Sequence, residues 1–166
     1  MSRLILIGWV AVLLLILSWL VWQKEQTAAH GRVVLLELAP RDPRSLMQGD
    51  YMVLTYRLGE AFEQSLIDYK MPQPRHVILK LDAKNIGTLQ RLDDGKPIAA
   101  DEIRLRFRNR HGRLRLGAES FFFQEGDAAK YEAARYGELR VDAQGNSVLI
   151  GLRDASQAQL GMPVIR

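Results

Sequence analysis

The residues capable of catalysis or metal binding are few in this 166-residue chain and form no recognisable set. The chain has no cysteine, which excludes disulfides, cysteine nucleophiles and thiolate metal sites. Its histidines, His30, His76 and His111, are far apart and belong to no HExxH pattern. Residues 93–95 read DDG, which is typical of a turn and lacks the terminal glutamate of a calcium loop. We therefore expect no metal, no cofactor and no enzymatic activity.

The octapeptide GDYMVLTY, which begins at Gly49, predicts a turn followed by a strand. Gly49 can adopt a positive φ without steric cost, and the Asp50 carboxylate can accept hydrogen bonds from nearby backbone N–H groups. Side chains alternate between the two faces of a strand. Leu54 and Tyr56 are therefore expected on one face and Tyr51 on the other, so the two tyrosines should not line a common pocket.

Two interpretations of this octapeptide are open. In the structural one, it supplies a tight turn and core tyrosines whose hydroxyls find partners. In the functional one, Asp50 joins Asp42 or Arg44 of the preceding loop in a recognition surface, because loops held by rigid strands often carry function. The functional interpretation predicts that this surface docks on a membrane partner.

The same octapeptide carries a family resemblance. GDYMVLTY resembles the octapeptide for which the bacterial GDYXXLXY family is named, and it matches all five fixed positions. The resemblance includes residues 42–46 (DPRSL), 120–123 (SFFF) and 136–142 (YGELRVD). It implies one N-terminal membrane helix, a domain of uncharacterised function, and a multi-spanning membrane protein as neighbour or fusion partner. It implies no particular reaction.

A second and shorter resemblance is to type I signal peptidases and related β-domain proteases. A proline-rich turn followed by Gly-Asp at the start of a strand resembles the segment around their serine nucleophile. That resemblance implies a serine three residues before Pro43, where this chain has Pro40; Ser45 is out of register, and Lys80 is the candidate base. A serine nucleophile needs its base within hydrogen-bond reach. An inactive scaffold of this kind is favoured over an active enzyme.

The positive charge of the chain is concentrated in one predicted hairpin. The chain carries 23 Lys+Arg against 19 Asp+Glu, a formal net charge of +4. Residues 101–117 contain six arginines and two acidic residues, and the rest of the chain is balanced. The six are Arg104, Arg106, Arg108, Arg110, Arg113 and Arg115. They indicate either a solvated strand face that resists edge pairing, or a contact for anionic lipid headgroups, an envelope polymer or an acidic partner.

An apolar N-terminal segment indicates where these residues act. Residues 4–22 carry no charge and would span ~29 Å as a helix, close to the thickness of the hydrocarbon core. Trp19 and Trp22 lie near one end, where indole rings favour the headgroup region. Residues 27–29 (TAA) resemble a signal-peptide cleavage site, but the apolar run is longer than a typical signal peptide core, which favours an uncleaved anchor. Arg3 predicts a cytoplasmic N-terminus.

The rest of the chain predicts one antiparallel β-rich domain, which makes the fold class α+β. Alternating apolar residues between turn signals indicate the strands, and the turns at residues 83–85 and 143–147 predict that the strands beside them pair as hairpins. The predicted strands span residues 32–39, 51–58, 76–82, 87–92, 102–109, 113–117, 120–124, 138–142 and 148–152. Two short helices are predicted over residues 59–69 and 125–135.

These features together predict a single-pass protein of the bacterial inner membrane. Residues 1–22 are expected to form the cytoplasmic tail and transmembrane anchor, 23–31 a stem, and 32–166 a periplasmic domain. The expected function is non-enzymatic docking on a multi-spanning membrane protein, with lipid or polymer binding and a signal-peptidase-like domain as alternatives. No nucleic-acid partner is expected, because the aromatic signatures of RNA-binding domains are missing. The candidate docking residues are Asp42, Arg44, Gly49, Asp50, Tyr51, Leu54 and Tyr56.

Overall fold

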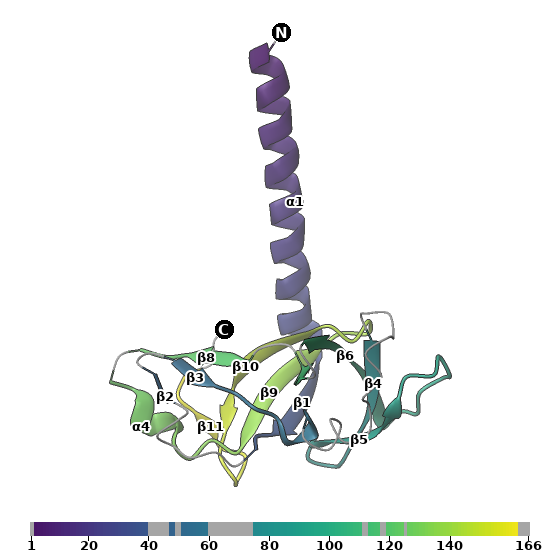
Figure 1. Cartoon of the computed structure of the whole chain (residues 1–166), viewed down its shortest axis with the longest axis vertical. Helices are drawn as coiled ribbons and strands as arrows, with labels where there is room; N and C mark the ends of the chain where they lie inside the picture. The colour runs from purple at the N-terminus through teal and green to yellow at the C-terminus, as the bar shows by residue number, and fades with distance from the viewer. Residues whose placement is uncertain are drawn as a thin grey trace.

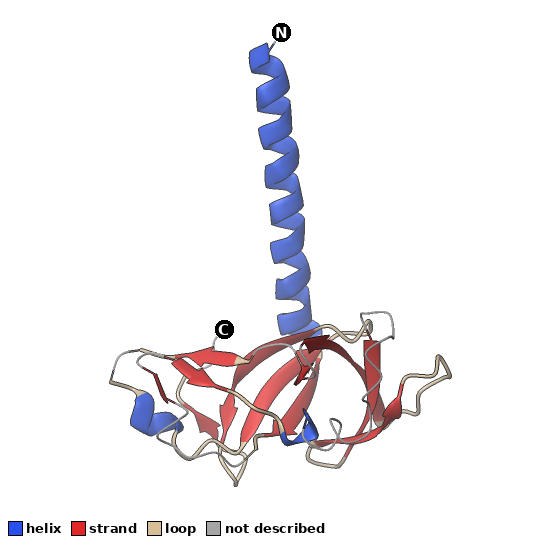
Figure 2. Ribbon diagram, viewed as in Figure 1, coloured by secondary structure: helices blue, strands red, loops and turns tan. Residues whose placement is uncertain are grey.

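One long helix precedes a strand-rich domain (Figure 1). The computed structural model describes residues 2–39, 47–48, 51–59, 75–110, 113–116, 119–124 and 126–162. The helices are α1 (Ser2–His30) and α4 (Ala128–Tyr131). The strands are β1 (Arg32–Glu37), β2 (Met47–Gln48), β3 (Tyr51–Val53), β4 (Arg75–Leu81), β5 (Gly87–Leu92), β6 (Glu102–Arg110), β7 (Arg113–Arg115), β8 (Ser120–Phe122), β9 (Tyr136–Val141), β10 (Ser147–Arg153) and β11 (Gln159–Leu160). Figure 2 shows that strands dominate the domain, which confirms the predicted α+β class.

The strands form three antiparallel sheets that share one core. The orders are β1-β9-β10-β11, β2-β3-β8 and β5-β4-β6-β7. Leu35 of β1 forms a bridge with Ile86 just before β5, and Leu38 forms one with Tyr56 just after β3, so β1 connects all three sheets. Buried apolar side chains from each sheet belong to a single cluster. Burial of this shared apolar surface holds the sheets together.

Two hairpins predicted from turn signals are confirmed. β4 pairs with β5, and β9 pairs with β10, each in antiparallel register. β1 lies on the other side of β9, with Arg32 opposite Val141 and Glu37 opposite Tyr136. The strand that directly follows α1 is therefore joined to the C-terminal hairpin, which ties the end of α1 to the β1-β9-β10-β11 sheet.

Several element boundaries differ from the prediction. The strand predicted over residues 51–58 ends at Val53, and a helical turn starts at Arg57, where the Gly59 N–H donates to the Tyr56 carbonyl at 2.9 Å. The helix predicted over residues 125–135 is only α4, because Gly126 has a φ of 86°, outside the helical region. Residues 60–69 lie outside the described residues. The two-residue strands β2 and β11 were not predicted.

The helix α1 continues through the segment predicted as a stem. Ile5–His30 comprises 26 residues and is long and apolar enough to cross a membrane. At 1.5 Å per residue it spans ~39 Å, more than the ~30 Å of a hydrocarbon core. Its apolar side chains are exposed, and the helix stands clear of the domain except at its last turns (Figure 1). α1 is thus a candidate membrane-spanning helix that enters the domain without a flexible linker.

Candidate functional site

The side-chain alternation predicted for the octapeptide is confirmed. Met52, Leu54 and Tyr56 are buried, whereas Tyr51 is half-buried. The period of two persists beyond the end of β3, because the bridge between Leu38 and Tyr56 keeps the backbone extended. Tyr51 and Tyr56 therefore lie in different environments, and no common pocket brings them together.

Three segments that carry the family resemblance meet in the structure. β3 lies beside β8 (Figure 1), and their antiparallel pairing places Tyr51 opposite Phe122. The ring of Tyr56 lies over Gly137 of β9, where a Cβ atom would be 3.0 Å from the Tyr56 Cε1 atom. Any side chain at position 137 would force the ring to move, since real Cβ atoms are rarely so close to other atoms. The octapeptide thus has a structural role at the junction of two sheets.

Tyr56 belongs to the core rather than to a surface. Its side chain is 5% exposed and is part of the central apolar cluster. Burial raises the pKa of the Tyr56 hydroxyl well above its ordinary value, and the negative charge of Glu119 raises it further. A phenol that is shielded from solvent and stays protonated is suited to packing, so Tyr56 supports the structural interpretation of the octapeptide.

The opposite face of the β3–β8 ribbon carries an exposed aromatic pair. The ring centroids of Tyr51 and Phe122 are 5.8 Å apart, and Phe122 is 72% exposed. The sequence predicted a strand over residues 120–124, in which the structure buries Phe121 and exposes Phe122. Alternation along β8 buries only one of these two neighbours. We define Tyr51 and Phe122 as the aromatic pair.

The proposed recognition loop and the protease-like residues are only partly visible. Five of the predicted residues lie outside the described residues: Asp42, Arg44, Ser45, Gly49 and Asp50. Lys80 is described, and its side chain is 56% exposed, with Nζ 3.5 Å from the Asp101 carboxylate. A lysine acts as a base near neutral pH when burial disfavours its charged form. Lys80 has neither the burial nor the uncharged surroundings that this role requires.

The strand β6 has an arginine face, as predicted. Its buried residues alternate with the outward-facing Arg104, Arg106 and Arg108. Arg104 Nε lies 2.7 Å from the Asp93 carboxylate, and Arg106 Nη1 donates to the amide oxygen of Asn146 at 3.1 Å. Among the described residues, Arg106 and Arg108 form no ion pair. The arginine face therefore contains positive charge that its neighbours do not neutralise.

The remaining arginines of the hairpin lie around β7. The backbone of Arg110 pairs with that of Arg113, which confirms the hairpin, but the side chains of both lie outside the described residues. Arg115 forms an ion pair with Glu119, the residue that immediately precedes β8. The hairpin is thus connected to the ribbon that carries the aromatic pair.

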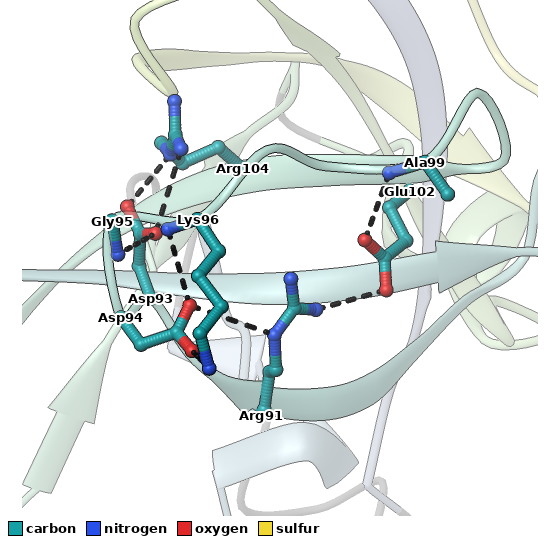
Figure 3. Close-up of polar contacts among 8 residues, drawn as sticks. All are labelled: Arg91, Asp93, Asp94, Gly95, Lys96, Ala99, Glu102 and Arg104. Carbon is teal, nitrogen blue, oxygen red and sulfur yellow. Dashed lines mark hydrogen bonds and ion pairs between the residues drawn. The ribbon is translucent and has the colours of Figure 1, made fainter.

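The acidic residues beside the arginine face stabilise a loop (Figure 3). Asp93 Oδ1 accepts a hydrogen bond from the Gly95 N–H at 3.1 Å, while Oδ2 lies 2.7 Å from Arg104 Nε. The hydrogen bond from the Lys96 side chain lowers the pKa of Asp94 below its ordinary value. Asp93 and Asp94 thus hold the connection between β5 and β6 through a turn and ion pairs, which agrees with the turn that the sequence predicted.

The end of α1 is packed against the sheet in a defined joint. Thr27 and Ala28 are buried, and the Thr27 hydroxyl donates to Asp142 Oδ2 at 3.0 Å. Gly31 follows immediately, and a Cβ atom there would overlap the Thr27 carbonyl oxygen and lie 2.8 Å from the Val141 nitrogen. Only glycine allows this close approach of helix and strand. The joint fixes the direction in which α1 leaves the domain.

The Asp142 carboxylate is the polar centre of this joint. Burial alone would raise the pKa of Asp142, but hydrogen bonds from Asn146, Thr27 and Gln144 outweigh it and lower the pKa below its ordinary value. Both oxygens accept hydrogen bonds, Oδ1 from the Gln144 and Asn146 N–H groups and Oδ2 from the Thr27 hydroxyl. The ionised carboxylate therefore contributes to the stability of the joint.

Acidification is expected to loosen this joint. Because the pKa of Asp142 is lower in the folded than in the unfolded chain, its contribution is complete above the unfolded value of about 3.9 and is lost as the pH falls below it. Hydrogen exchange of the amides of residues 27–31, corrected for intrinsic rates, should show protection at neutral pH that decreases as the pH falls below about 3.9. Asp142→Asn should reduce this pH dependence; an unchanged dependence would contradict the assignment.

A hollow lies between the last turns of α1 and the adjacent surface of the domain. Its lining comes from α1, from strands β6 to β8 and from the turn between β9 and β10. Its basic residues are Lys24, Arg32, Arg104, Arg106, Arg108 and Arg115. Its acidic residues are Glu102, Glu119 and Asp142, and each has a basic or hydroxyl partner. Phe122 also lines this surface, which we call the helix-side hollow.

His30 and His76, the two described histidines, are not part of a metal site. In the described part of the chain, no three histidine, aspartate or glutamate side chains are placed to hold a metal ion. His30 ends α1 and His76 lies on β4, while His111 falls outside the described residues.

The chain consists of an apolar helix long enough to cross a membrane and an antiparallel α+β domain that follows it directly. Residues 13–152 match the family described as GDYXXLXY protein, and the chain belongs to the GDYXXLXY family. The match starts within α1 and ends in β10, so it includes both the helix and the sheets. No curated protein and no solved structure matches the chain.

Proposed function

We propose that this chain is a membrane-anchored accessory domain that docks on a multi-spanning membrane protein. In this proposal, α1 crosses the bacterial inner membrane with its N-terminus in the cytoplasm, and the sheets lie in the periplasm. The observation that carries the docking is the exposed aromatic pair on the ribbon that contains the octapeptide. Aromatic residues are enriched at protein interfaces, where they bury a large area at a small cost in side-chain entropy.

The position of the aromatic pair supports docking beside the membrane. Phe122 lines the helix-side hollow together with Leu20 and Trp22, which lie at the end of the apolar segment. The helix rises ~14 Å between Trp22 and Gly31, so the domain begins within about that distance of the hydrocarbon boundary. A partner that spans the same membrane would reach this surface without having to extend far into the periplasm.

An accessory role fits the described residues better than a protease does. The candidate base Lys80 on β4 is exposed and paired with Asp101, and Ser45 lies outside the described residues. A signal-peptidase-like scaffold that retained only its binding surface would still be compatible with docking.

Copurification tests the docking surface. Phe122→Ala in the full-length, membrane-extracted chain is expected to reduce the recovery of a multi-spanning membrane protein by at least about tenfold, because truncating an aromatic hot spot commonly costs more than 1–2 kcal/mol of binding. Tyr51→Ala should have a similar effect, since it removes the other ring of the aromatic pair. Asp50→Ala tests in the same assay whether the loop before β3 belongs to the surface.

The matched control for this experiment is Met162→Ala. Met162 is 69% exposed, similar to Phe122, but it does not line the helix-side hollow. Its replacement should leave recovery unchanged, and thermal unfolding should show that all variants are folded. Recovery of the partner with Phe122→Ala at the level of the unmodified chain would refute the proposed docking surface.

A further inference from the structure

We infer that the arginine face of β6 binds anionic lipid headgroups of the membrane that α1 enters. The inference rests on the membrane anchor of the proposed function, but it does not depend on the docking partner. It assigns a ligand class, the phosphate group of an anionic phospholipid, to the helix-side hollow. It also assigns the positive charge of the chain to contact with the membrane surface.

The geometry of the joint places the arginine face on the side of the domain from which α1 emerges. Arg32, the first residue of β1, donates from Nη1 to the carbonyl oxygens of Ala100 at 2.9 Å and Glu102 at 3.2 Å. The Arg106 N–H donates to the Gly145 carbonyl at 2.8 Å, which ties β6 to the turn that contains Asp142. β6 therefore lies next to the base of α1, as Figure 1 shows. If α1 crosses the bilayer, β6 is on the membrane side of the domain.

The charge of the hollow is complementary to an anionic surface. It contains six basic residues against three acidic ones. The acidic residues are used internally: Glu119 pairs with Arg115, Glu102 with Arg91, and Asp142 accepts from Thr27. Arg32 donates to backbone carbonyls, and Lys24, Arg106 and Arg108 form no ion pair among the described residues. These three cations are left for an external anion.

The chemistry of the side chains and their distance from the bilayer favour lipid phosphate over an acidic protein. Arginine presents a planar fork of N–H donors that matches phosphate oxygens. Leu20 and Trp22 line the same hollow at the end of the apolar segment, where tryptophan rings lie at the headgroup level. Anionic phosphate groups are thus supplied by the bilayer at the mouth of the hollow. An acidic protein would have to displace these headgroups first.

Modification of arginine side chains by phenylglyoxal tests this inference. The full chain is inserted into nanodiscs of phosphatidylcholine alone or with phosphatidylglycerol, and modification of each arginine is followed by mass spectrometry. Phosphatidylglycerol is expected to slow the modification of Arg106 and Arg108 by roughly fivefold, the effect of one basic residue near an anionic surface. The protection should disappear at about 1 M salt, where the Debye length is only about 3 Å. Arg57, 54% exposed and outside the hollow, should react equally in both lipids.

Variants separate charge at the arginine face from charge elsewhere. Arg108→Gln, at an exposed position, should reduce the protection of Arg106 by phosphatidylglycerol, whereas Lys84→Gln combined with Lys96→Gln should not. Equal modification rates in the two lipids would overturn the inference. Protection that appears only in native membranes, and not with phosphatidylglycerol, would also overturn it and would indicate an acidic protein instead. A chain that fails to insert into nanodiscs would contradict the anchor of the proposed function, which is a different result.

Discussion

Replacement of Tyr56 by alanine is expected to destabilise the domain by about 3–5 kcal/mol, the usual cost of deleting a large buried aromatic side chain. The Tyr56 ring is 5% exposed and fills the space above Gly137, so its loss leaves a cavity where β9 meets the end of the octapeptide. The backbone of β9 at Gly137 limits how far the surrounding residues can move into this cavity. Chemical unfolding of the solubilised full chain would measure the change in the free energy of unfolding.

Tyr51→Ala is the matched control for this prediction, because it is the same substitution in the same octapeptide. Tyr51 is half-buried and loses mainly its contact with Phe122, a pair worth roughly 1 kcal/mol. Tyr56→Ala should therefore reduce mainly the free energy of unfolding, and Tyr51→Ala should reduce mainly the docking. Equal destabilisation by both substitutions would contradict the assignment of Tyr56 to the core.

Gly31→Ala is expected to have the second largest effect, at the upper end of the about 1–3 kcal/mol that overpacking typically costs. The added methyl group would overlap the Thr27 carbonyl oxygen and approach the backbone of Arg140 and Val141. These are backbone atoms of α1 and β9, so neither can rotate away as a side chain would. Relief requires the helix to move from the sheet, which breaks the contact between Thr27 and Asp142.

The consequence of Gly31→Ala is a loss of defined orientation as well as of stability. Amides of residues 27–31 should exchange faster, and the protection of Arg108 by phosphatidylglycerol should decrease, because the arginine face would no longer be held beside the bilayer. Gly8→Ala is the matched control in the same helix, since a Cβ atom at Gly8 would meet nothing within 4 Å. Similar behaviour of the two variants would contradict the rigid joint.

Much of the fold could be predicted from the sequence because it depends on local periodicity. The alternation of apolar and charged residues in β6 directly gave both the strand and the arginine face. The hairpin of β4 and β5 followed from its turn residues, among which Asn85 adopts a φ of 60°. The uncharged N-terminal run likewise indicated the helix α1. Each of these features is determined by residues that are close together in the sequence.

The features that depend on contacts distant in sequence could not be predicted. Whether Phe121 or Phe122 points into the core is set by the pairing of β8 with β3, which are almost 70 residues apart. The segment predicted as a stem belongs to α1, and its packing on the sheet depends on the hydrogen bond from Thr27 to Asp142, which are 115 residues apart. The need for glycine at positions 31 and 137 comes from the close approach of Val141 and Tyr56, which the sequence does not show. Of the predicted site, the structure describes Tyr51, Leu54 and Tyr56 and places only Tyr51 at the surface.

The central claim, that this domain docks on a membrane protein through the aromatic pair, is tested most directly by crosslinking in native membranes. A photoreactive amino acid at position 122 should crosslink to one multi-spanning membrane protein, identified by mass spectrometry. The same group at position 162 should not crosslink to it, because Met162 lies outside the helix-side hollow. Crosslinks from position 122 to lipid alone, or equal crosslinking from both positions, would contradict the claim.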